Sequence, residues 1–363
     1  MIFLKLDKIL FFTVILLSLF GLLMIYSSSN IWANYKFNDS FHYLKYQGFF
    51  FFIGLFIMIL ISRVDYHLYF KCSNKILLVS FILLILVLVP GIGSIRNGSR
   101  SWFGIGPLGI QPSEAAKISL IIFTSKYLSL NERYVSNFFK GIVPVLLIVI
   151  TFFGLIMLQP DLGTGLILLL SVISILFIAG ASMRFFLGGG IVGLISVIIL
   201  IIIAPYRMNR ITSFINPWND PLGTGFQMIQ SLYAIGPGGL LGLGLGKSIQ
   251  KHFYLPEPQT DFIFSIISEE FGVMGSVIVV GLFVILFYRG IKICLNTNDL
   301  FSKYLSFGIL FQLIFQTIMN LFVVVGLIPV TGVTLPFLSY GGSSLLVSMA
   351  SIGIILNISR NNN

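Results

Sequence analysis

Uninterrupted runs of about 20 apolar residues, the length a helix needs to cross a hydrocarbon layer of about 30 Å, recur throughout this 363-residue chain. Only 9% of the residues are charged, and the mean hydropathy of +1.01 lies far outside the range of soluble domains. We therefore predict an all-α, polytopic membrane protein with about ten transmembrane helices in a single domain, residues 1–363. The predicted spans are residues 8–26, 45–61, 75–90, 112–128, 141–158, 160–180, 184–204, 261–288, 303–326 and 333–357.

The distribution of lysine and arginine predicts the orientation of these spans, because short loops rich in such cations stay on the cytoplasmic side. The cations assigned to that side are Lys5, Lys8, Arg63, Lys71, Lys126, Arg133, Lys140, Arg184, Arg289, Lys292 and Arg360. Both termini are therefore expected in the cytoplasm, and the first apolar run is expected to remain as an uncleaved helix. The net charge of +10 is dispersed over membrane loops, which argues against binding to nucleic acid.

A large outer loop is predicted at residues 205–260, just before the eighth helix, and it contains a glycine-rich loop at residues 236–246. Long ordered loops are usually functional, and the turn residues favour folding against the membrane. Two further outer segments, residues 91–111 and 159–165, contribute a Gln-Pro pair at a helix start. Proline suits the first helical turn, and an acid there meets the positive end of the helix dipole. We expect three helices to begin on the outer side with a carboxylate.

Asp261 directly precedes the eighth apolar run. Thr260 is predicted to cap that helix, with Asp261 in its first turn. Ser265, Ser268 and Gly272 would follow at i+4, i+7 and i+11, forming a small polar face that can line a cavity. The alternative is an acid that only complements the helix dipole, which is worth about 0.3–1 kcal/mol.

Glu114 and Lys117 are three residues apart and can pair on one face of the fourth helix. A lysine inside a span is costly, so the pair is either structural or part of a functional pathway. Asp161 could equally be a helix cap without a chemical role. Three residues of the outer loops could also have no role in a site: Trp102 could lie at the membrane interface, and Arg100 and Arg210 could contact lipid headgroups.

Several catalytic patterns do not fit. Residues 242–248 (GLGLGKS) resemble a phosphate-binding loop, but that pattern requires glycine where the chain has Leu241. The histidines and cysteines lack metal-ligand spacing, and nothing resembles a nucleophile elbow. The remaining acids near Asp261 are expected to be ordinary loop and helix features: Glu257, Glu269 and Glu270. An outer cavity with carboxylates and cations suits either proton-coupled transport or transfer chemistry on an anionic lipid.

Seven motifs, in order along the chain, resemble those of one family. They are SRSWF (99–103), QPSEAAK (111–117), QPDLGT (159–164), NPWNDP (216–221), GFQMIQS (225–231), YLPEPQTDFIF (254–264) and PFLSYGGSS (336–344). On these motifs the chain resembles the SEDS proteins (shape, elongation, division and sporulation). The PEPQTD pattern is more similar to the FtsW and SpoVE branches than to the RodA branch, which usually has a His-Thr-Asp variant.

The resemblance implies a peptidoglycan glycosyltransferase that polymerises lipid II at the outer face of the bacterial cytoplasmic membrane, for a division septum or spore cortex. The family's essential aspartate falls on Asp261, the implied general base for the attacking sugar hydroxyl, while undecaprenyl pyrophosphate leaves. The implied substrate-binding residues are Arg100, Trp102, Glu114, Lys117, Asp161 and Arg210.

The resemblance implies no definite cofactor, although a divalent cation, Mg²⁺ or Mn²⁺, is compatible with a pyrophosphate substrate. It also implies a protein partner, a class B penicillin-binding protein that cross-links the nascent glycan. Two other functions remain open at this point: a lipid II flippase, and a non-catalytic scaffold that recruits the transpeptidase.

Overall fold

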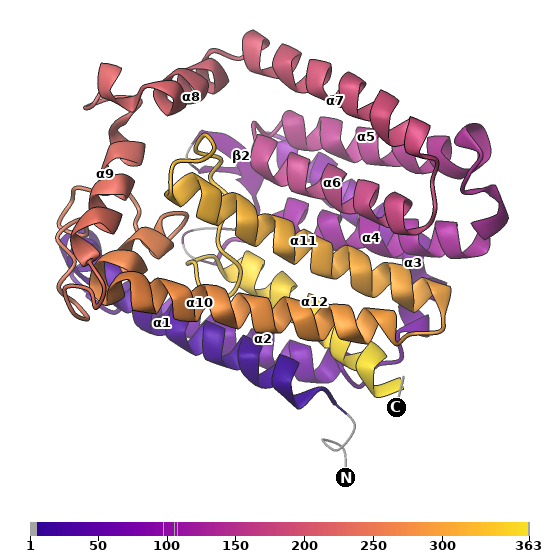
Figure 1. The fold of residues 1–363 in the computed structure, drawn as a ribbon, viewed down its shortest axis with the longest axis horizontal. Coiled ribbons are helices and arrows are strands. Elements are labelled where there is room, and N and C mark those ends of the chain that lie inside the picture. The colour runs from indigo at the N-terminus through magenta and orange to yellow at the C-terminus, as the bar shows by residue number, and fades with distance from the viewer. Residues whose placement is uncertain (1–5, 97, 105, 107, 362–363) are drawn as a thin grey trace.

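The computed structural model describes residues 6–96, 98–104, 106 and 108–361. Long helices run side by side through most of it (Figure 1). In chain order the elements are α1 (Lys8–Phe37), α2 (His42–Ile61), α3 (His67–Leu88), β1 (Ser94–Arg96), β2 (Ser99–Trp102), α4 (Pro112–Leu130), α5 (Val143–Met157), α6 (Leu162–Ile178), α7 (Met183–Ile203), α8 (Pro205–Ile215), α9 (Phe226–Ile235), α10 (Ile263–Leu295), α11 (Leu300–Val324) and α12 (Gly342–Asn361).

The prediction of an all-α, polytopic membrane protein is confirmed. Among the described residues, eight helices are long and apolar enough to cross a membrane. α6 lies at a predicted span but has 17 residues, and α4 lies at another but buries a glutamate and a lysine. The count of ten spans therefore stays a prediction.

α1 is longer than predicted, because it continues from residue 26 to Phe37. Ser27, Ser28 and Ser29 follow the predicted span, and their side chains are hydrogen-bonded inside the protein. Ser29 Oγ donates to the carbonyl of Ile25 in the preceding turn at 2.6 Å, and Ser27 Oγ binds a glutamate of α10. A serine that finds a buried partner does not interrupt a membrane helix.

α12 begins at Gly342, nine residues after the start of the predicted span. The preceding residues, 325–341, are not helical, and residues 335–339 among them are buried. Some of their backbone groups are hydrogen-bonded by neighbouring helices. Gln47 of α2, for example, donates to the carbonyl of Ser339 and accepts from the amide of Gly341, each at 3.2 Å. Irregular backbone is tolerated at membrane depth only when it is buried in this way.

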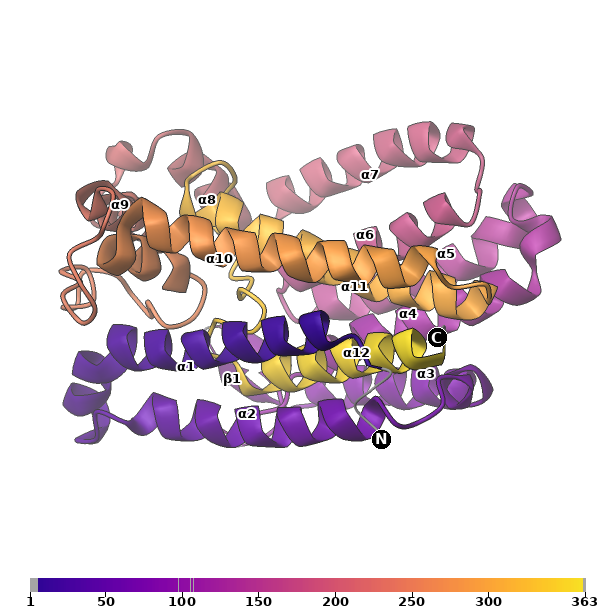
Figure 2. The ribbon, with the colours of Figure 1, turned by 60° about the horizontal axis from the view of Figure 1, so that its bottom comes forward.

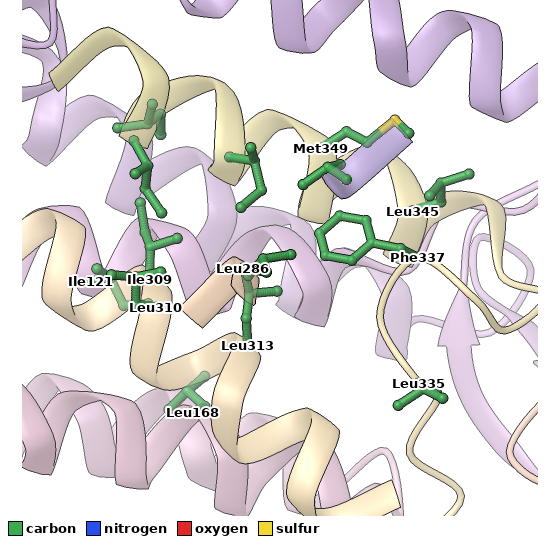
Figure 3. Packing of buried hydrophobic residues seen from close by; sticks show 14 of the residues in the cluster. Ile121, Leu168, Leu286, Ile309, Leu310, Leu313, Leu335, Phe337, Leu345 and Met349 are labelled. Carbon is green, nitrogen blue, oxygen red and sulfur yellow. The ribbon is translucent and has the colours of Figure 1, made fainter. Parts of the chain in front are cut away.

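The core lies between α4, α6, α10, α11 and α12 and consists mainly of leucine and isoleucine (Figure 3). Small residues let helices approach closely, as is common in membranes. α2 and α12 illustrate this packing, because a Cβ atom on Gly54 would lie 2.6 Å from the sulfur of Met349. A larger residue at position 54 would therefore require Met349 to move.

The start of α1 and the end of α12 lie at the same end of the bundle, whereas β1, α8 and α9 lie at the opposite end (Figure 2). The outer loop predicted at residues 205–260 is folded, as expected, and contains the two short helices α8 and α9 that the sequence did not indicate. α7 runs along the outside of the bundle, and its side chains are exposed or half-buried.

α10 is broken at Gly272, where φ is 64° and ψ is −159°, a conformation that only glycine adopts without strain. The backbone of the glycine-rich loop enters this break. The amides of Val273 and Met274 donate to loop carbonyls at 3.0 and 3.1 Å, and loop amides donate to the carbonyls of Glu269 and Glu270, each at 2.9 Å. The glycines thus permit close backbone packing, and the backbone groups that the break frees from the helix are hydrogen-bonded to the loop.

Candidate active site

Asp261 lies in the turn before α10. The helix begins at Ile263 with Phe262 at its N-cap position, so the predicted Thr260 cap and the first-turn placement of Asp261 are wrong. The carbonyl of Asp261 instead accepts a hydrogen bond from Asn320 of α11 at 2.7 Å, which holds it in a turn. Thr260 Oγ1 lies 2.9 Å from Asp261 Oδ1 and orients the carboxylate.

The surroundings of Asp261 alter its acidity. Burial raises the pKa of its carboxyl group, whereas the hydrogen bond from Thr260 lowers it. Glu257 raises the same pKa and Arg210 lowers it, through their charges. Arg210 is held by a hydrogen bond from its Nη1 to the carbonyl of Val330 at 3.0 Å. The structure therefore brings two of the predicted site residues, Asp261 and Arg210, into one electrostatic environment.

The polar face predicted to follow Asp261 packs against other elements, so the expected cavity lining is wrong. Ser265 is fully buried and lies 2.8 Å from Ser231 of α9. The break at Gly272 also interrupts the helical periodicity on which that expectation rested. Since α10 begins only at Ile263, the expectation of a carboxylate starting this third helix is wrong as well.

Glu114 and Lys117 form the predicted ion pair on α4, with 2.9 Å between Lys117 Nζ and Glu114 Oε1. Lys117 is only 1% exposed, and its ammonium also donates to Gln316 of α11 at 3.1 Å. Gln316 in turn donates to the carbonyl of Thr334 at 3.0 Å. A buried lysine requires such partners, because an unpaired charge in this interior is very costly.

α11 connects this pair to Asp261. Gln316 and Asn320 are four residues apart on α11, so their amides lie on the same face. Asn320 donates to the carbonyl of Val333 at 2.8 Å as well as to that of Asp261. One helix face therefore holds both Lys117 and the turn of Asp261 against the segment before α12.

The hairpin of β1 and β2 supplies aromatic and cationic groups. The guanidinium of Arg96 lies over the ring of Trp102, and its Cζ atom is 4.6 Å from the ring centroid. Burial lowers the pKa of Arg96, and one of its nitrogens, Nη2, is a buried atom without a partner in the described part of the chain. Arg100 is half-buried on β2 and pairs with Ile95 in the ladder. Arg96 is thus a half-buried cation that lies over Trp102 in this hairpin.

Asp161 caps α6 by accepting from the amide of Thr164 at 3.0 Å. Its second oxygen accepts from Gln111, the residue before α4, at 3.1 Å. Ser99 of the hairpin also binds the carbonyl of Gln159. Asp161 therefore has the structural role considered from the sequence, and these contacts tie the hairpin, α4 and α6 together.

Several buried polar atoms next to these groups have no hydrogen-bond partner within the described residues. They are Ser113 Oγ, both amide atoms of Gln159, Gln259 Oε1, Asn320 Oδ1 and Ser343 Oγ. Buried polar groups normally bind something, so these atoms are available to a polar substrate or to water. Together with a carboxylate of raised pKa and nearby cations, they suit proton abstraction beside an anionic leaving group.

Glu269 and Glu270 are more than helix features, which corrects their predicted role. Both are fully buried on α10 and form a glutamate clamp with Ser27, Ser248 and Lys251. Ser27 Oγ lies 2.7 and 2.6 Å from the two oxygens of Glu270, and Lys251 Nζ lies 3.4 Å from one of them.

Glu269 completes the clamp by accepting from the amides of Ile249 and Gln250 at 2.8 and 3.4 Å, and from the hydroxyl of Ser248. Two adjacent acids inside an apolar run were a signal for buried partners. The partners themselves come from α1 and from the outer loop, distant in sequence.

The described residues offer few protein ligands for a divalent cation. Among the described residues, no group of three or more His, Cys, Asp or Glu could hold a metal ion. A cation such as Mg²⁺ prefers several oxygen ligands and often shares substrate phosphates. Asp261 would be its protein ligand here, with the remaining positions left to substrate and water.

Sequence comparison decides the family. The model of the family of FtsW, RodA and SpoVE, described as a cell cycle protein, matches residues 7–363. The chain is 51% identical to Stage V sporulation protein E of Bacillus subtilis (strain 168), over 98% of this chain and 97% of that protein. The chain belongs to the FtsW, RodA and SpoVE family. It is also 41% identical to a probable peptidoglycan glycosyltransferase FtsW of Geobacter sp. (strain M18), over 97% and 96% of the two chains.

Solved structures of this SEDS family share the fold. A chain from a structure reported as "Structural coordination of polymerization and crosslinking by a peptidoglycan synthase complex" has a TM-score of 0.82 and 32% identity, over 99% of both chains. The rod shape determining protein RodA of Thermus thermophilus has a TM-score of 0.75 and 30% identity, over 100% of this chain and 99% of that one. These similarities support the SEDS resemblance of the motifs.

Proposed function

We propose that this protein is a peptidoglycan glycosyltransferase that polymerises lipid II into glycan strands at the outer face of the bacterial cytoplasmic membrane. The observation that carries the proposal is the Asp261 carboxylate, whose pKa is raised by burial and which Thr260 and Asn320 hold in place. FtsW relatives described as peptidoglycan glycosyltransferases support the class of reaction.

In the proposed reaction, Asp261 takes the proton from the 4-hydroxyl of the N-acetylglucosamine of one lipid II. That oxygen attacks the anomeric carbon of the N-acetylmuramic acid at the end of the growing chain, and the bond to undecaprenyl pyrophosphate breaks. Pyrophosphate needs charge stabilisation more than protonation. Arg210, Lys117 and Arg100 are the proposed phosphate contacts.

Three other residues have supporting roles in this proposal. Glu114 orients Lys117, as their 2.9 Å contact allows. Trp102 packs on sugar or lipid, and Asp161 holds the starts of α4 and α6 together. The cation on Arg96 lies over Trp102 and adds positive charge beside the same hairpin.

The orientation and the partner belong to the same proposal. The end of the bundle with β1, α8 and α9 faces outward, and both termini lie in the cytoplasm, as the lysine and arginine distribution predicts. A class B penicillin-binding protein is the proposed partner, since one structural relative comes from a peptidoglycan synthase complex. The similarity to Stage V sporulation protein E and to FtsW favours work on a spore cortex or division septum.

Incubation of the purified protein with lipid II, with and without the transpeptidase, tests the function. We expect polymeric glycan on a gel, sensitive to a muramidase, together with release of undecaprenyl pyrophosphate. Translocation of labelled lipid II in vesicles without polymer would instead identify a flippase. If neither occurs and the protein only co-purifies with the transpeptidase, it is a scaffold.

The pH dependence of polymerisation should report on Asp261. The base must be ionised, and burial raises its pKa, so activity should fall on the acid side at a pH above the 3.8 of an ordinary aspartate. Arg210→Met removes a charge that lowers this pKa and should move the acid limb to higher pH. Arg133→Met, an exposed cation in the turn after α4, is the control and should leave the limb in place. A limb that moved to lower pH in Arg210→Met would contradict this assignment.

A further inference from the structure

Aromatic side chains gather where α1, α2 and the outer loop meet. The ring centroid of Phe253, in the outer loop, lies 5.5 Å from that of Trp32 and 5.4 Å from that of Tyr35, both near the end of α1. Trp32 is also a side-chain hydrogen-bond partner of Tyr43 at the start of α2. We call these four residues, Trp32, Tyr35, Tyr43 and Phe253, the aromatic platform.

The length of α1 allows the platform to extend beyond the hydrocarbon layer. α1 has 30 residues, which corresponds to a length of about 45 Å, whereas the hydrocarbon layer is about 30 Å thick. Tyr35 lies in the last turns of α1 and is 77% exposed, and Phe253 is 51% exposed. Rings of this size in that position present flat apolar faces to the outer medium.

Phe253 is also held rigidly in an unfavourable conformation. Its φ of 66° is unusual for a bulky residue and lowers the free energy of unfolding of the protein. Lys251, two residues earlier, is fixed by the glutamate clamp through Glu270 and by the carbonyl of Gly246 at 2.6 Å. Such strain persists only when the surrounding structure enforces it, and it is concentrated at functional sites.

Contacts continue from the platform to the catalytic turn. The rings of Tyr43 and Tyr340 pack edge to face with centroids 5.0 Å apart. The amide of Tyr340 donates to the carbonyl of Gln259 at 2.8 Å, two residues before Asp261. The aromatic surface therefore leads outward from the proposed base.

We propose that the aromatic platform binds the glycan strand as it leaves the site, a chain of N-acetylated hexose rings. Sugar rings stack their C–H faces on flat aromatic rings, and the tyrosine hydroxyls can bind their hydroxyl and acetamido groups. Lys36, whose ammonium lies 5.9 Å from the Trp32 ring centroid, matches the carboxylates that such a strand carries. The inference rests on the proposed function, because it takes the product of that reaction as the ligand.

Strand length and oligosaccharide binding test the platform. Tyr35→Ala and Phe253→Ala should each yield glycan strands several-fold shorter than wild type, since a weakly held product leaves earlier. Chitohexaose, an N-acetylated oligosaccharide, should bind the wild-type protein in calorimetry, and each variant should bind it about tenfold more weakly. Maltohexaose, which lacks acetamido groups, is the ligand control and should bind weakly to all of them.

Two variants keep failure of this inference apart from failure of the proposed function. Asp261→Asn should lose polymerisation and still bind chitohexaose. Phe12→Ala changes a 62% exposed ring near the opposite end of α1 and should leave strand length and binding unchanged. Wild-type strand length in both platform variants would overturn the inference. If they lose only the stimulation by the transpeptidase, the surface is a protein interface and the inference is equally wrong.

Discussion

Asp261→Asn is expected to abolish polymerisation of lipid II, with a loss of about 10²–10⁴-fold, the usual contribution of a general base. Asparagine has the same shape as aspartate and can still bind Thr260 Oγ1, but it cannot take a proton at neutral pH. The carbonyl of residue 261 remains bound to Asn320, so the turn should keep its conformation. The measurement is the initial rate of undecaprenyl pyrophosphate release from purified lipid II.

The control for this experiment is Glu257→Gln, which removes an exposed carboxylate four residues earlier in the same loop. It should retain most of the activity, because the substitution removes a charge that raises the pKa of Asp261 and keeps the carbonyl of residue 257, which binds Thr260. The thermal unfolding of both variants in detergent should match that of the wild type. Polymerisation at the wild-type rate by Asp261→Asn would exclude this residue as the base.

Among the proposed variants, Glu270→Ala is expected to lower the free energy of unfolding most. It leaves the ammonium of Lys251, which is 3% exposed, without its carboxylate, and it removes the partner of Ser27. Breaking a buried ion pair from one side typically costs about 3–5 kcal/mol. We expect a clearly lower unfolding temperature in detergent, together with faster proteolysis of the outer loop.

Two comparisons isolate the clamp in this prediction. Glu132→Ala removes an exposed glutamate after α4 and should change the unfolding temperature little. Adding Lys251→Met to Glu270→Ala removes the unpaired cation and should restore part of the lost stability. A double variant as unstable as the sum of the two single variants would mean that these groups do not interact.

Local features of the sequence predicted the helices and some of the contacts. Apolar run length placed the long helices, and a spacing of three residues predicted the pair of Glu114 and Lys117, which the structure confirms. Motif resemblance drew attention to Asp261, and the structure adds its neighbours Arg210 and Asn320. Properties that depend on a few consecutive residues were therefore accessible.

Features that depend on contacts between residues distant in sequence could not be predicted from the sequence. The predicted span ends just before Ser27, whereas the helix continues and Ser27 binds Glu270 of α10. Thr260 is a residue type that favours the N-cap position. The helix nevertheless begins at Ile263, because Asn320 binds the backbone carbonyl of Asp261. In each case a contact across the bundle outweighs a local preference.

The break in α10 has a mechanical consequence. The glycine-rich loop shares backbone hydrogen bonds with α10 residues on both sides of Gly272, so we expect the loop and the two parts of the helix to move as one body. Asp261 lies just before this helix. We therefore expect a displacement of the loop to be transmitted to the turn that carries the carboxylate.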